Sequence, residues 1–414
     1  MLEHYFDIPS TLEQLRSCDV GAHIDGFADH LRERGYSRWT ACKYLHASAH
    51  LLRFLRHENV ALEFLEDKTL GKFRQHLHHC DCRRPNGGVG KDARNGVSVF
   101  YDYLRGVGAI RAIAEDEIKP IPPPLVQSFC HWLRQHCGAA ESTLRLYSRG
   151  ATQLVGTLGD EPGQYDAETL RAFVLDRSRQ SGKGATQALI TSVRSFLRYL
   201  ATEGKCSATL EKAIPSPAGW RLSSLPRYLS DAELKRTINA CDVDTQQGIR
   251  DHAILLLLAR LGLRASDVAS LRFFDFDWQD ATVVVSGKTR RQERLPLPQE
   301  VGDAVLRYLE QRPLRLDDDQ VFLRLTAPRQ PLSSGGVSTI ARRAMRRAKL
   351  STPRGSHVLR HTAATQLLRQ GVSLDAIRTL LRHRSVDMTA TYAKVDLELL
   401  QQVAQPWPEV LRCS

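Results

Sequence analysis

The amino-acid sequence predicts a mainly α-helical protein with two N-terminal helical bundles and a C-terminal α+β domain that contains a small antiparallel sheet. Three observations lead to this fold class. The chain of 414 residues is longer than one hydrophobic core usually requires, so two or three domains are expected. Apolar residues with helical spacing recur in the first half at an offset near one hundred residues. A β-branched run at residues 282–285 interrupts the helical patterns of the second half.

The first half of the chain is predicted to contain one unit of about four helices twice. Three apolar patterns occur in pairs, and each has the spacing of one helix face. The pairs are Phe27-x3-Leu31 with Phe129-x3-Leu133, Thr69-Leu70-x2-Phe73 with Thr169-Leu170-x2-Phe173, and Val97-x2-Phe100-x2-Tyr103 with Val193-x2-Phe196-x2-Tyr199. The two units would span roughly 20–112 and 124–210. Chance similarity between amphipathic helices is the alternative explanation.

Proline-rich segments mark the expected domain boundaries, because proline cannot continue a helix and stiffens a linker. One such segment lies at residues 119–124 (KPIPPP), and a second contains Pro215, Pro217 and Pro226. The expected parts are an N-terminal helical domain at 1–118, a second helical domain at 119–213, a linker at 214–227 and a C-terminal domain at 228–414.

The C-terminal domain is predicted to combine helices with a short β-hairpin. Ser230 and Glu233 have the spacing of a capping box, so a helix should begin there. Residues 251–261 are almost wholly apolar, which predicts a buried helix. The β-branched run at 282–285 and the segment 293–297 would form the hairpin, with Lys288 at or near its turn.

Composition and charge indicate a protein that works on a polyanion. The apolar content of 42% and the charged content of 25% are ordinary for a globular protein, and the formal net charge is +12. Such a balance favours a nucleic acid partner, although it could also serve solubility alone. No signal peptide is evident, and the longest strongly apolar run, 253–259, is too short to span a bilayer, so we expect a cytoplasmic protein without a membrane partner.

The cysteines and histidines do not predict a disulfide framework or a metal site. Nine cysteines are an odd number and are scattered along the chain. One cluster contains His76, His78, His79, Cys80 and Cys82, but its spacing matches no common zinc module. We therefore interpret it as a helix end that continues into a glycine-containing loop, and we predict no metal and no cofactor.

Several residues of the C-terminal domain could act on a phosphate. The glycine turn at Gly262 would direct Arg264 away from the end of the buried helix, and Asp267 is close enough in sequence to pair with that guanidinium. Lys288, near the hairpin turn, could protonate a leaving oxygen. Each of these residues, taken alone, could equally be an ordinary surface side chain.

A second group of residues lies closer to the C-terminus. His357 and Arg360 are three residues apart and would share a helix face, where the arginine could grip a phosphate and the histidine could move a proton. His361 lies on a different face and is expected to be structural. His383 precedes Tyr392 by nine residues, and the tyrosine could act as a nucleophile if nearby arginines favour its phenolate over a phenol of pKa about 10.

The order of these residues resembles that of the tyrosine site-specific recombinases, the phage-integrase and Xer-like family. The match covers 228–400, and its intervals of 24 residues from Arg264 to Lys288, 23 from Arg360 to His383 and 9 from His383 to Tyr392 are similar to those of the family. The segments 359–365 (LRHTAAT) and 380–385 (LLRHRS) resemble its most recognisable motifs.

The resemblance implies a mechanism in which a tyrosine forms a 3′-phosphotyrosyl bond with DNA and frees a 5′-hydroxyl. The implied catalytic residues are Arg264, Lys288, His357, Arg360, His383 and Tyr392. No metal or ATP is implied, because the covalent link retains the energy of the broken bond. The implied partners are double-stranded DNA, further copies of the chain in a tetramer on two duplexes, and possible partner recombinases. Residues 397–411 would dock on a neighbouring copy.

Residues 124–210 resemble the core-binding domain of this family, and the additional N-terminal bundle suggests a DNA-binding or assembly domain of a recombinase carried by a transposon or other mobile element. Two positions depart from the family pattern: Asp267 stands where many relatives have Glu, and Arg382 stands where relatives commonly have Gly. Integration, excision and transposition remain open. The alternatives are a type IB topoisomerase and a DNA-binding protein without catalytic activity.

Overall fold

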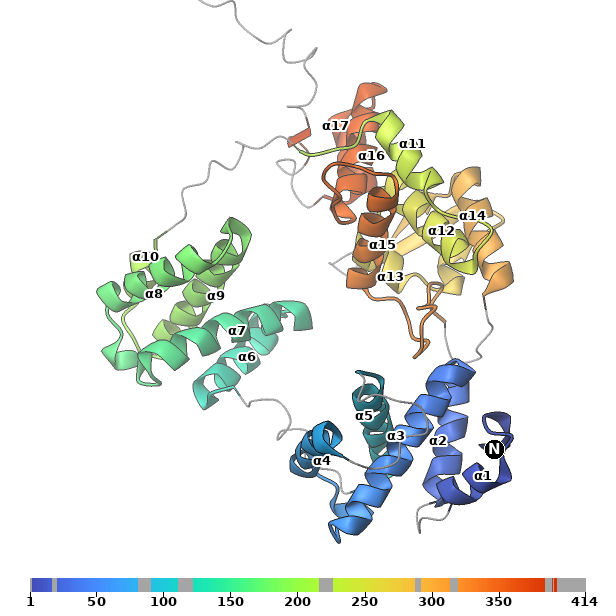
Figure 1. Ribbon diagram of the computed structural model, residues 1–414. Helices are drawn as coiled ribbons and strands as arrows, with labels where there is room; N and C mark the ends of the chain where they lie inside the picture. The colour runs from blue at the N-terminus through green and yellow to red at the C-terminus, as the bar shows by residue number, and fades with distance from the viewer. Residues whose placement is uncertain are drawn as a thin grey trace, which may run out of the picture. The chain divides into compact units, whose positions relative to one another are not determined.

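The computed structural model is mainly helical, as the sequence predicts, and contains one three-stranded antiparallel sheet (Figure 1). It describes residues 2–16, 21–80, 91–110, 122–215, 226–286, 292–312, 319–383, 389, 391 and 392. The chain divides into two compact units, of which one is Ile110–Arg221 and the other combines Met1–Ala109 with Leu222–Ser414. No helix among the described residues is both long enough and apolar enough to cross a membrane.

The first bundle is built on the long helix α3, which begins where the Ser37 hydroxyl accepts a hydrogen bond from the Thr40 main-chain N–H (3.3 Å). Helices α2 and α5 pack against it. The elements of this bundle are η1 (Leu2–His4), α1 (Pro9–Arg16), α2 (Gly21–Glu33), α3 (Arg38–His57), η2 (Leu62–Phe64), α4 (Asp67–His79) and α5 (Lys91–Gly106).

The second bundle follows the proline-rich segment. Pro124 is the first residue of α6, a position where its missing N–H costs nothing, and Gly138 ends the helix with a φ of 56°. The Asp166 carboxylate caps α8 by accepting two main-chain N–H groups. The elements are α6 (Pro124–Cys137), α7 (Glu141–Leu158), η4 (Pro162–Gln164), α8 (Ala167–Gln180), α9 (Lys183–Thr202) and α10 (Leu210–Ala213).

The two bundles contain the same cluster of three aromatic rings. In the first bundle the Phe27 and Phe100 centroids are 4.9 Å apart, and Phe27 and Tyr103 are 5.5 Å apart. At the corresponding positions of the second bundle, Phe129 lies 5.1 Å from Phe196 and 5.5 Å from Tyr199. The interplanar angles also agree within a few degrees, 58° against 63° and 43° against 39°. This agreement supports the internal repeat predicted from residue spacing.

The C-terminal part begins with the predicted capping box, in which Ser230 and Glu233 cap each other's main chain. Its helices surround α12, which corresponds to the predicted buried helix. The elements are α11 (Asp231–Asn239), α12 (Gln246–Arg260), α13 (Ala265–Ser270), η5 (Phe273–Asp275), β1 (Phe276–Asp277), β2 (Thr282–Ser286), β3 (Gln292–Pro296), α14 (Gln299–Gln311), α15 (Ser334–Arg347), α16 (His357–Arg369) and α17 (Leu374–Leu381).

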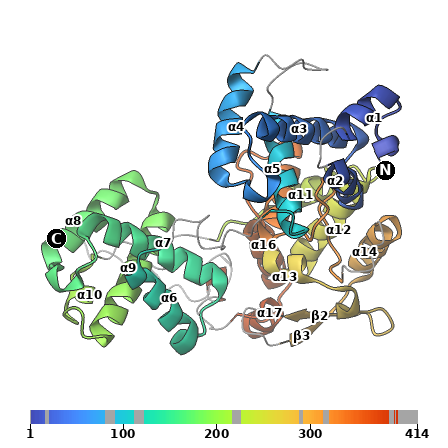
Figure 2. The same cartoon turned by 90° about the horizontal axis from the view of Figure 1, so that it is seen from below.

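The predicted hairpin is confirmed by the antiparallel pair β2 and β3, which lie side by side in Figure 2 with Val283 opposite Leu295. Both of these side chains are buried. The residues between the two strands, 287–291, include Lys288 and lie outside the described part of the chain.

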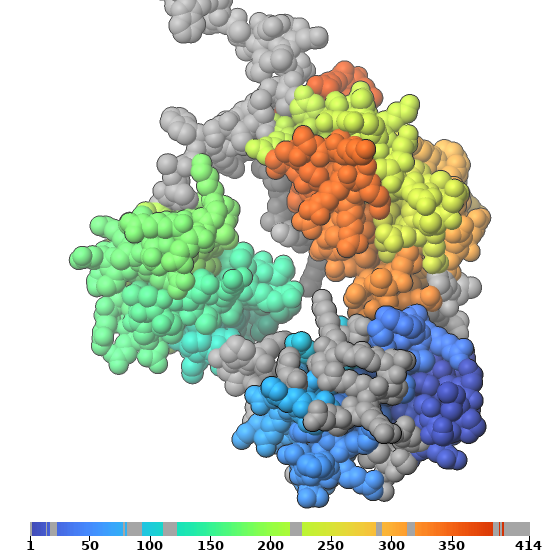
Figure 3. All heavy atoms as spheres, viewed as in Figure 1, coloured from blue at the N-terminus to red at the C-terminus, as the bar shows by residue number. Residues whose placement is uncertain are grey.

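Helix α12 is buried on nearly all sides because α11, α13, α14, α15 and α16 all contact it. Figure 3 shows α15, in orange, beside the yellow-green α11 on the surface of this part. Such burial agrees with the apolar sequence of α12 and makes it a rigid base for the turn that follows its last residue, Arg260.

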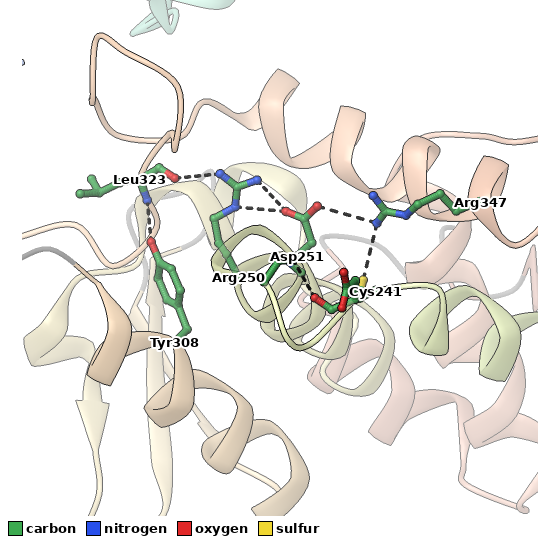
Figure 4. A network of polar contacts seen from close by, with 9 residues as sticks. Cys241, Arg250, Asp251, Tyr308, Leu323 and Arg347 are labelled. Carbon is green, nitrogen blue, oxygen red and sulfur yellow. Dashed lines mark hydrogen bonds and ion pairs between the residues drawn. The ribbon is translucent and has the colours of Figure 1, made fainter. Parts of the chain in front are cut away.

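A buried polar network crosses this core (Figure 4). Asp251 on α12 pairs with Arg250, whose Nη1 also donates to the Leu323 carbonyl oxygen at 3.1 Å. The Tyr308 hydroxyl accepts the Leu323 main-chain N–H at 3.2 Å. On the other side, Arg347 of α15 lies 3.8 Å from the second carboxylate oxygen of Asp251. The network therefore ties α12 to α14, α15 and the segment at Leu323.

Candidate functional site

Arg360 joins three separate segments of the C-terminal part. It lies in the first turn of α16 and is 4% exposed. Its Nη1 donates to the Gly262 carbonyl oxygen at 2.5 Å, and its Nη2 donates to the carbonyl oxygen of Leu381 at the end of α17. Burial and the nearby Arg264 guanidinium lower the pKa of Arg360 to about 10, so the side chain is still charged at neutral pH.

The turn after α12 requires glycine at position 262. Gly262 has a φ of 59°, in the left-handed region, and an added Cβ would lie 2.6 Å from a Leu381 methyl carbon. Two residues on, Arg264 is the N-cap of α13, and its Nη2 donates to the Arg382 carbonyl oxygen at 3.0 Å. Both arginines are thus held by main-chain carbonyl groups.

Asp267 differs in its partner from the sequence-based expectation, which pairs it with the Arg264 guanidinium. Its carboxylate accepts the Arg264 main-chain N–H at 2.9 Å and forms an ion pair with Arg382. Both side chains of this pair are almost fully buried, at 3% and 4% exposure. Asp267 and Arg382, the two residues that depart from the family pattern, therefore contact each other. Their separation in the sequence gives no sign of this contact.

Arg382, which the sequence marks only as a departure from the family pattern, lies among the predicted site residues. It caps α17 with φ 53° and ψ 52°, a conformation that favours glycine. Its Nε and Nη1 atoms are buried and have no hydrogen-bond partner among the described residues. A third guanidinium is therefore held beside Arg264 and Arg360, and its charge is balanced by Asp267.

Tyr392 is 2% exposed and belongs to an apolar cluster that includes Ile377 and Leu381. Its hydroxyl group is 2.8 Å from Nδ1 of His361. Sequence analysis assigned His361 a structural role, but this contact places a ring nitrogen at the phenolic oxygen. On the other side, the His383 ring is parallel to the Tyr392 ring, with centroids 6.1 Å apart and an interplanar angle of 6°.

Burial and positive charge shift the pKa values of the site in predictable directions. Burial raises the pKa of the Tyr392 phenol, and the Arg360 charge offsets part of that rise. Burial, followed by the charges of Arg360 and Arg264, lowers the pKa of His383 to about 4 and also lowers that of His357. At neutral pH the site therefore combines a protonated phenol with uncharged histidines.

Five of the six predicted catalytic residues thus fall within one electrostatic neighbourhood. Arg264 and Arg360 influence the titration of each predicted histidine, and Arg360 influences Tyr392. His383 is also held by a contact of 2.8 Å between its Nδ1 and the Thr389 hydroxyl. The sixth, Lys288, is outside the described residues.

Helix α15 carries a solvent-exposed basic face. Its members share one surface of the helix, while the apolar residues between them are buried. They are Arg342, Arg343, Arg346, Arg347 and, just beyond the helix, Lys349. Exposed guanidiniums at this density are suited to contacts with nucleic acid phosphates.

The chain is similar to known proteins along most of its length. Residues 227–398 match the model of the phage integrase family. The "Putative integrase/recombinase y4rA" of Sinorhizobium fredii (strain NBRC 101917 / NGR234) is 33% identical over 94% of this chain and 95% of its own length. The tyrosine recombinase XerD of Listeria monocytogenes serotype 4b (strain F2365) is 28% identical over 67% of this chain and 96% of its own length.

Solved structures with a similar fold include two recombinases in complex with DNA. One is the XerH site-specific recombinase bound to a palindromic difH substrate, with a TM-score of 0.55 and 18% identity over 84% of this chain and 99% of that chain. The other is a lambda integrase dimer bound to a COC′ core site, with a TM-score of 0.53 and 20% identity over 65% of this chain and 93% of that chain.

The lowered pKa of His383 predicts acid sensitivity. Below the unfolded value of 6.5 the unfolded chain binds a proton that the folded chain does not bind until about pH 4. The free energy of unfolding should therefore fall as pH decreases through this window, by roughly 2 kcal/mol between pH 7 and pH 5. Urea unfolding at the two pH values measures it. His383→Asn should reduce the difference, and an unchanged difference in that variant would contradict this origin.

The buried pair of Asp267 and Arg382 predicts strong coupling between the two side chains. Asp267→Asn and Arg382→Gln should each lower the free energy of unfolding by about 3–5 kcal/mol, because each leaves one charge buried without its partner. The double variant should lose less than the sum, by about 1–3 kcal/mol. Urea unfolding of the four proteins measures the coupling, and strictly additive losses would show that the pair does not interact.

Proposed function

The chain belongs to the phage integrase family and is a tyrosine recombinase, an enzyme of site-specific DNA recombination, and we propose that Tyr392 is its nucleophile. The observation that carries this proposal is the position of the Tyr392 hydroxyl, 2.8 Å from His361 and within the electrostatic reach of Arg360. A phenolic oxygen, a nearby base and fixed guanidiniums are what attack on a DNA phosphate requires.

Arg264 and Arg360 would bind the non-bridging oxygens of the scissile phosphate. Their guanidiniums are held by the carbonyl groups of Gly262, Leu381 and Arg382, so little reorganisation is needed when charge develops. Burial lowers the pKa of Arg360, and repulsion from the like charge of Arg264 lowers it further. A phosphate bound between the two guanidiniums relieves that repulsion. The electrostatic stabilisation of the phosphate is largest in the transition state, where its negative charge is greatest.

Proton transfer accompanies the attack, because the Tyr392 phenol, whose pKa burial raises above its ordinary value of 10, is protonated at neutral pH. His361 Nδ1 is placed to accept the phenolic proton as the oxygen–phosphorus bond forms. The bond from phosphorus to the 5′ oxygen then breaks, and Lys288 donates a proton to that oxygen. His357 would act as acid or base and His383 would donate a hydrogen bond to the phosphate. A 5′-hydroxyl from a partner duplex reverses the step.

Substrate and assembly follow from the same mechanism. The partner of this enzyme is DNA, and the exposed basic face of α15 supplies sequence-independent phosphate contacts. We propose that four copies of the chain, or copies together with partner recombinases, act on two duplexes. In this assembly residues 397–411 would dock on a neighbouring copy. We also propose that the enzyme works in the cytoplasm. Residues 397–411 lie outside the described part of the chain.

We propose three domains at 1–118, 119–213 and 228–414, joined by the linker at 214–227. The repeated aromatic cluster supports two related bundles, so the N-terminal bundle would contact DNA as a core-binding domain does. The additional bundle is also matched in the integrase/recombinase of S. fredii, whereas XerD matches 67% of this chain. We propose that the chain is a recombinase of a mobile element, acting in integration, excision or transposition.

The nucleophile can be tested with a nicked suicide duplex that carries the recombination site. Without Mg²⁺, the wild-type protein should form a covalent protein–DNA adduct that is visible by denaturing electrophoresis, because the cleaved 5′ fragment diffuses away. Tyr392→Phe should form none. Tyr228→Phe, which changes a tyrosine hydrogen-bonded to Arg369, is the matched control and should form the adduct. Adducts that persist in Tyr392→Phe would refute the assignment.

The role of the N-terminal bundle can be tested by deletion. Removing residues 1–112 should weaken or redirect binding to the recombination site, because the phosphate contacts of one bundle are lost. Footprinting and titration at two salt concentrations measure the change, which should include a shallower salt dependence. An unchanged footprint with unchanged recombination would argue against DNA contact by this bundle.

A further inference from the structure

The N-terminal bundle brings together three side chains that the recombination mechanism does not use. His50 lies on α3, His76 lies on α4, and Cys80 caps the C-terminus of α4. Nε2 of His76 is 3.3 Å from Nε2 of His50, and Sγ of Cys80 is 3.4 Å from the same nitrogen. All three atoms lie within 4.8 Å of one another.

These separations match the edges of a tetrahedral zinc site. With zinc–nitrogen bonds of about 2.0–2.1 Å and a zinc–sulfur bond of about 2.3 Å, neighbouring ligand atoms lie roughly 3.3–3.6 Å apart. The two measured distances, 3.3 and 3.4 Å, fall at this spacing. Two imidazoles and a thiolate also form a donor set that zinc prefers over the hard cations magnesium and calcium.

The surrounding side chains hold the two imidazoles in position. The His50 ring meets the buried Phe73 edge-on at 5.2 Å, and the His76 ring lies 5.0 Å from Phe54. His76 and Cys80 are four residues apart, so both project from the same side of α4 toward α3. A preformed, largely apolar surround of this kind limits the access of water and fixes ligand direction.

Hydrogen bonding alone is the competing explanation for the cluster. The tautomers of His50 and His76 would then decide which atoms donate, whereas a metal ion accepts a lone pair from all three atoms together. The repeat shows that the bundle fold does not need the cluster, since the positions of His76 and Cys80 correspond to Asp176 and Gln180 in the second bundle. The cluster is therefore an addition specific to the first bundle.

We propose that His50, His76 and Cys80 bind a zinc ion that fastens α3 to α4. Both imidazoles coordinate through Nε2, and the thiol releases its proton as the sulfur binds. Three protein ligands leave one tetrahedral position for water or a further ligand. In the sequence, the histidines and cysteines around Cys80 have no further metal ligand at the spacing of a common zinc module. His50 supplies that ligand from a different helix, α3.

The experiment measures zinc in the purified full-length chain after dialysis against a zinc-containing and then a metal-free buffer. Wild type should retain about one zinc per chain by elemental analysis, and Co²⁺ in its place should give thiolate-to-cobalt charge-transfer absorption. Zinc should raise the melting temperature of wild type. Cys80→Ser and His50→Gln should lose the bound zinc, the cobalt absorption and the thermal shift.

Two matched variants control for nonspecific effects in the same bundle. Cys42→Ser removes a half-buried thiol on α3, and His57→Gln removes an exposed imidazole at the end of that helix. Both should bind zinc as wild type does. Circular dichroism checks that the ligand variants remain helical. Absence of thiolate–cobalt absorption in wild type, or equal zinc retention in wild type and Cys80→Ser, would overturn the proposal irrespective of how the variants fold.

Discussion

The hydrogen bonds of Arg360 to two main-chain carbonyl groups organise the catalytic part of this recombinase. They connect α16 to the turn after α12, 98 residues away in sequence, and to the end of α17, 21 residues away. The same guanidinium sets the charge that acts on Tyr392 and the histidines. This side chain therefore joins three segments of the site, and its charge adds to burial in lowering the pKa of His383 and offsets part of the rise that burial causes in the pKa of Tyr392.

Burying several positive charges close together is unfavourable in free energy, and several neighbouring groups reduce this cost. Carbonyl oxygens carry partial negative charge and accept from Arg264 and Arg360, while a full carboxylate, Asp267, neutralises Arg382. Burial, followed by the charges of Arg360 and Arg264, lowers the pKa values of His357 and His383, so both histidines are uncharged at neutral pH. The described residues of the site thus combine three guanidiniums with one carboxylate and uncharged histidines.

The two helical bundles show how one core can support different surfaces. Their aromatic clusters have nearly equal ring separations, since packing restricts which shapes fit together. Outside that core the bundles diverge, and the positions of His76 and Cys80 in the first hold Asp176 and Gln180 in the second. Constraints on packing therefore preserved the core while the exterior remained free to acquire other contacts.

Much of the architecture was predictable because local sequence patterns have local structural causes. Helical spacing revealed the repeated bundles, β-branched residues revealed the hairpin, and Ser230 with Glu233 revealed a helix start. The order of Arg264, Arg360, His383 and Tyr392 resembles that of the phage integrase family, to which the chain belongs, and the catalytic roles of these residues stay a prediction.

Only the tertiary structure decided which distant side chains meet. The ion pair of Asp267 with Arg382 spans 115 residues, and the contact of His361 with Tyr392 depends on how α16 lies against the segment after α17. Neither spacing nor periodicity specifies such contacts, because they arise from the packing of whole helices. Sequence determined the types of groups and their local placement, while packing determined their partners and thereby their charge states.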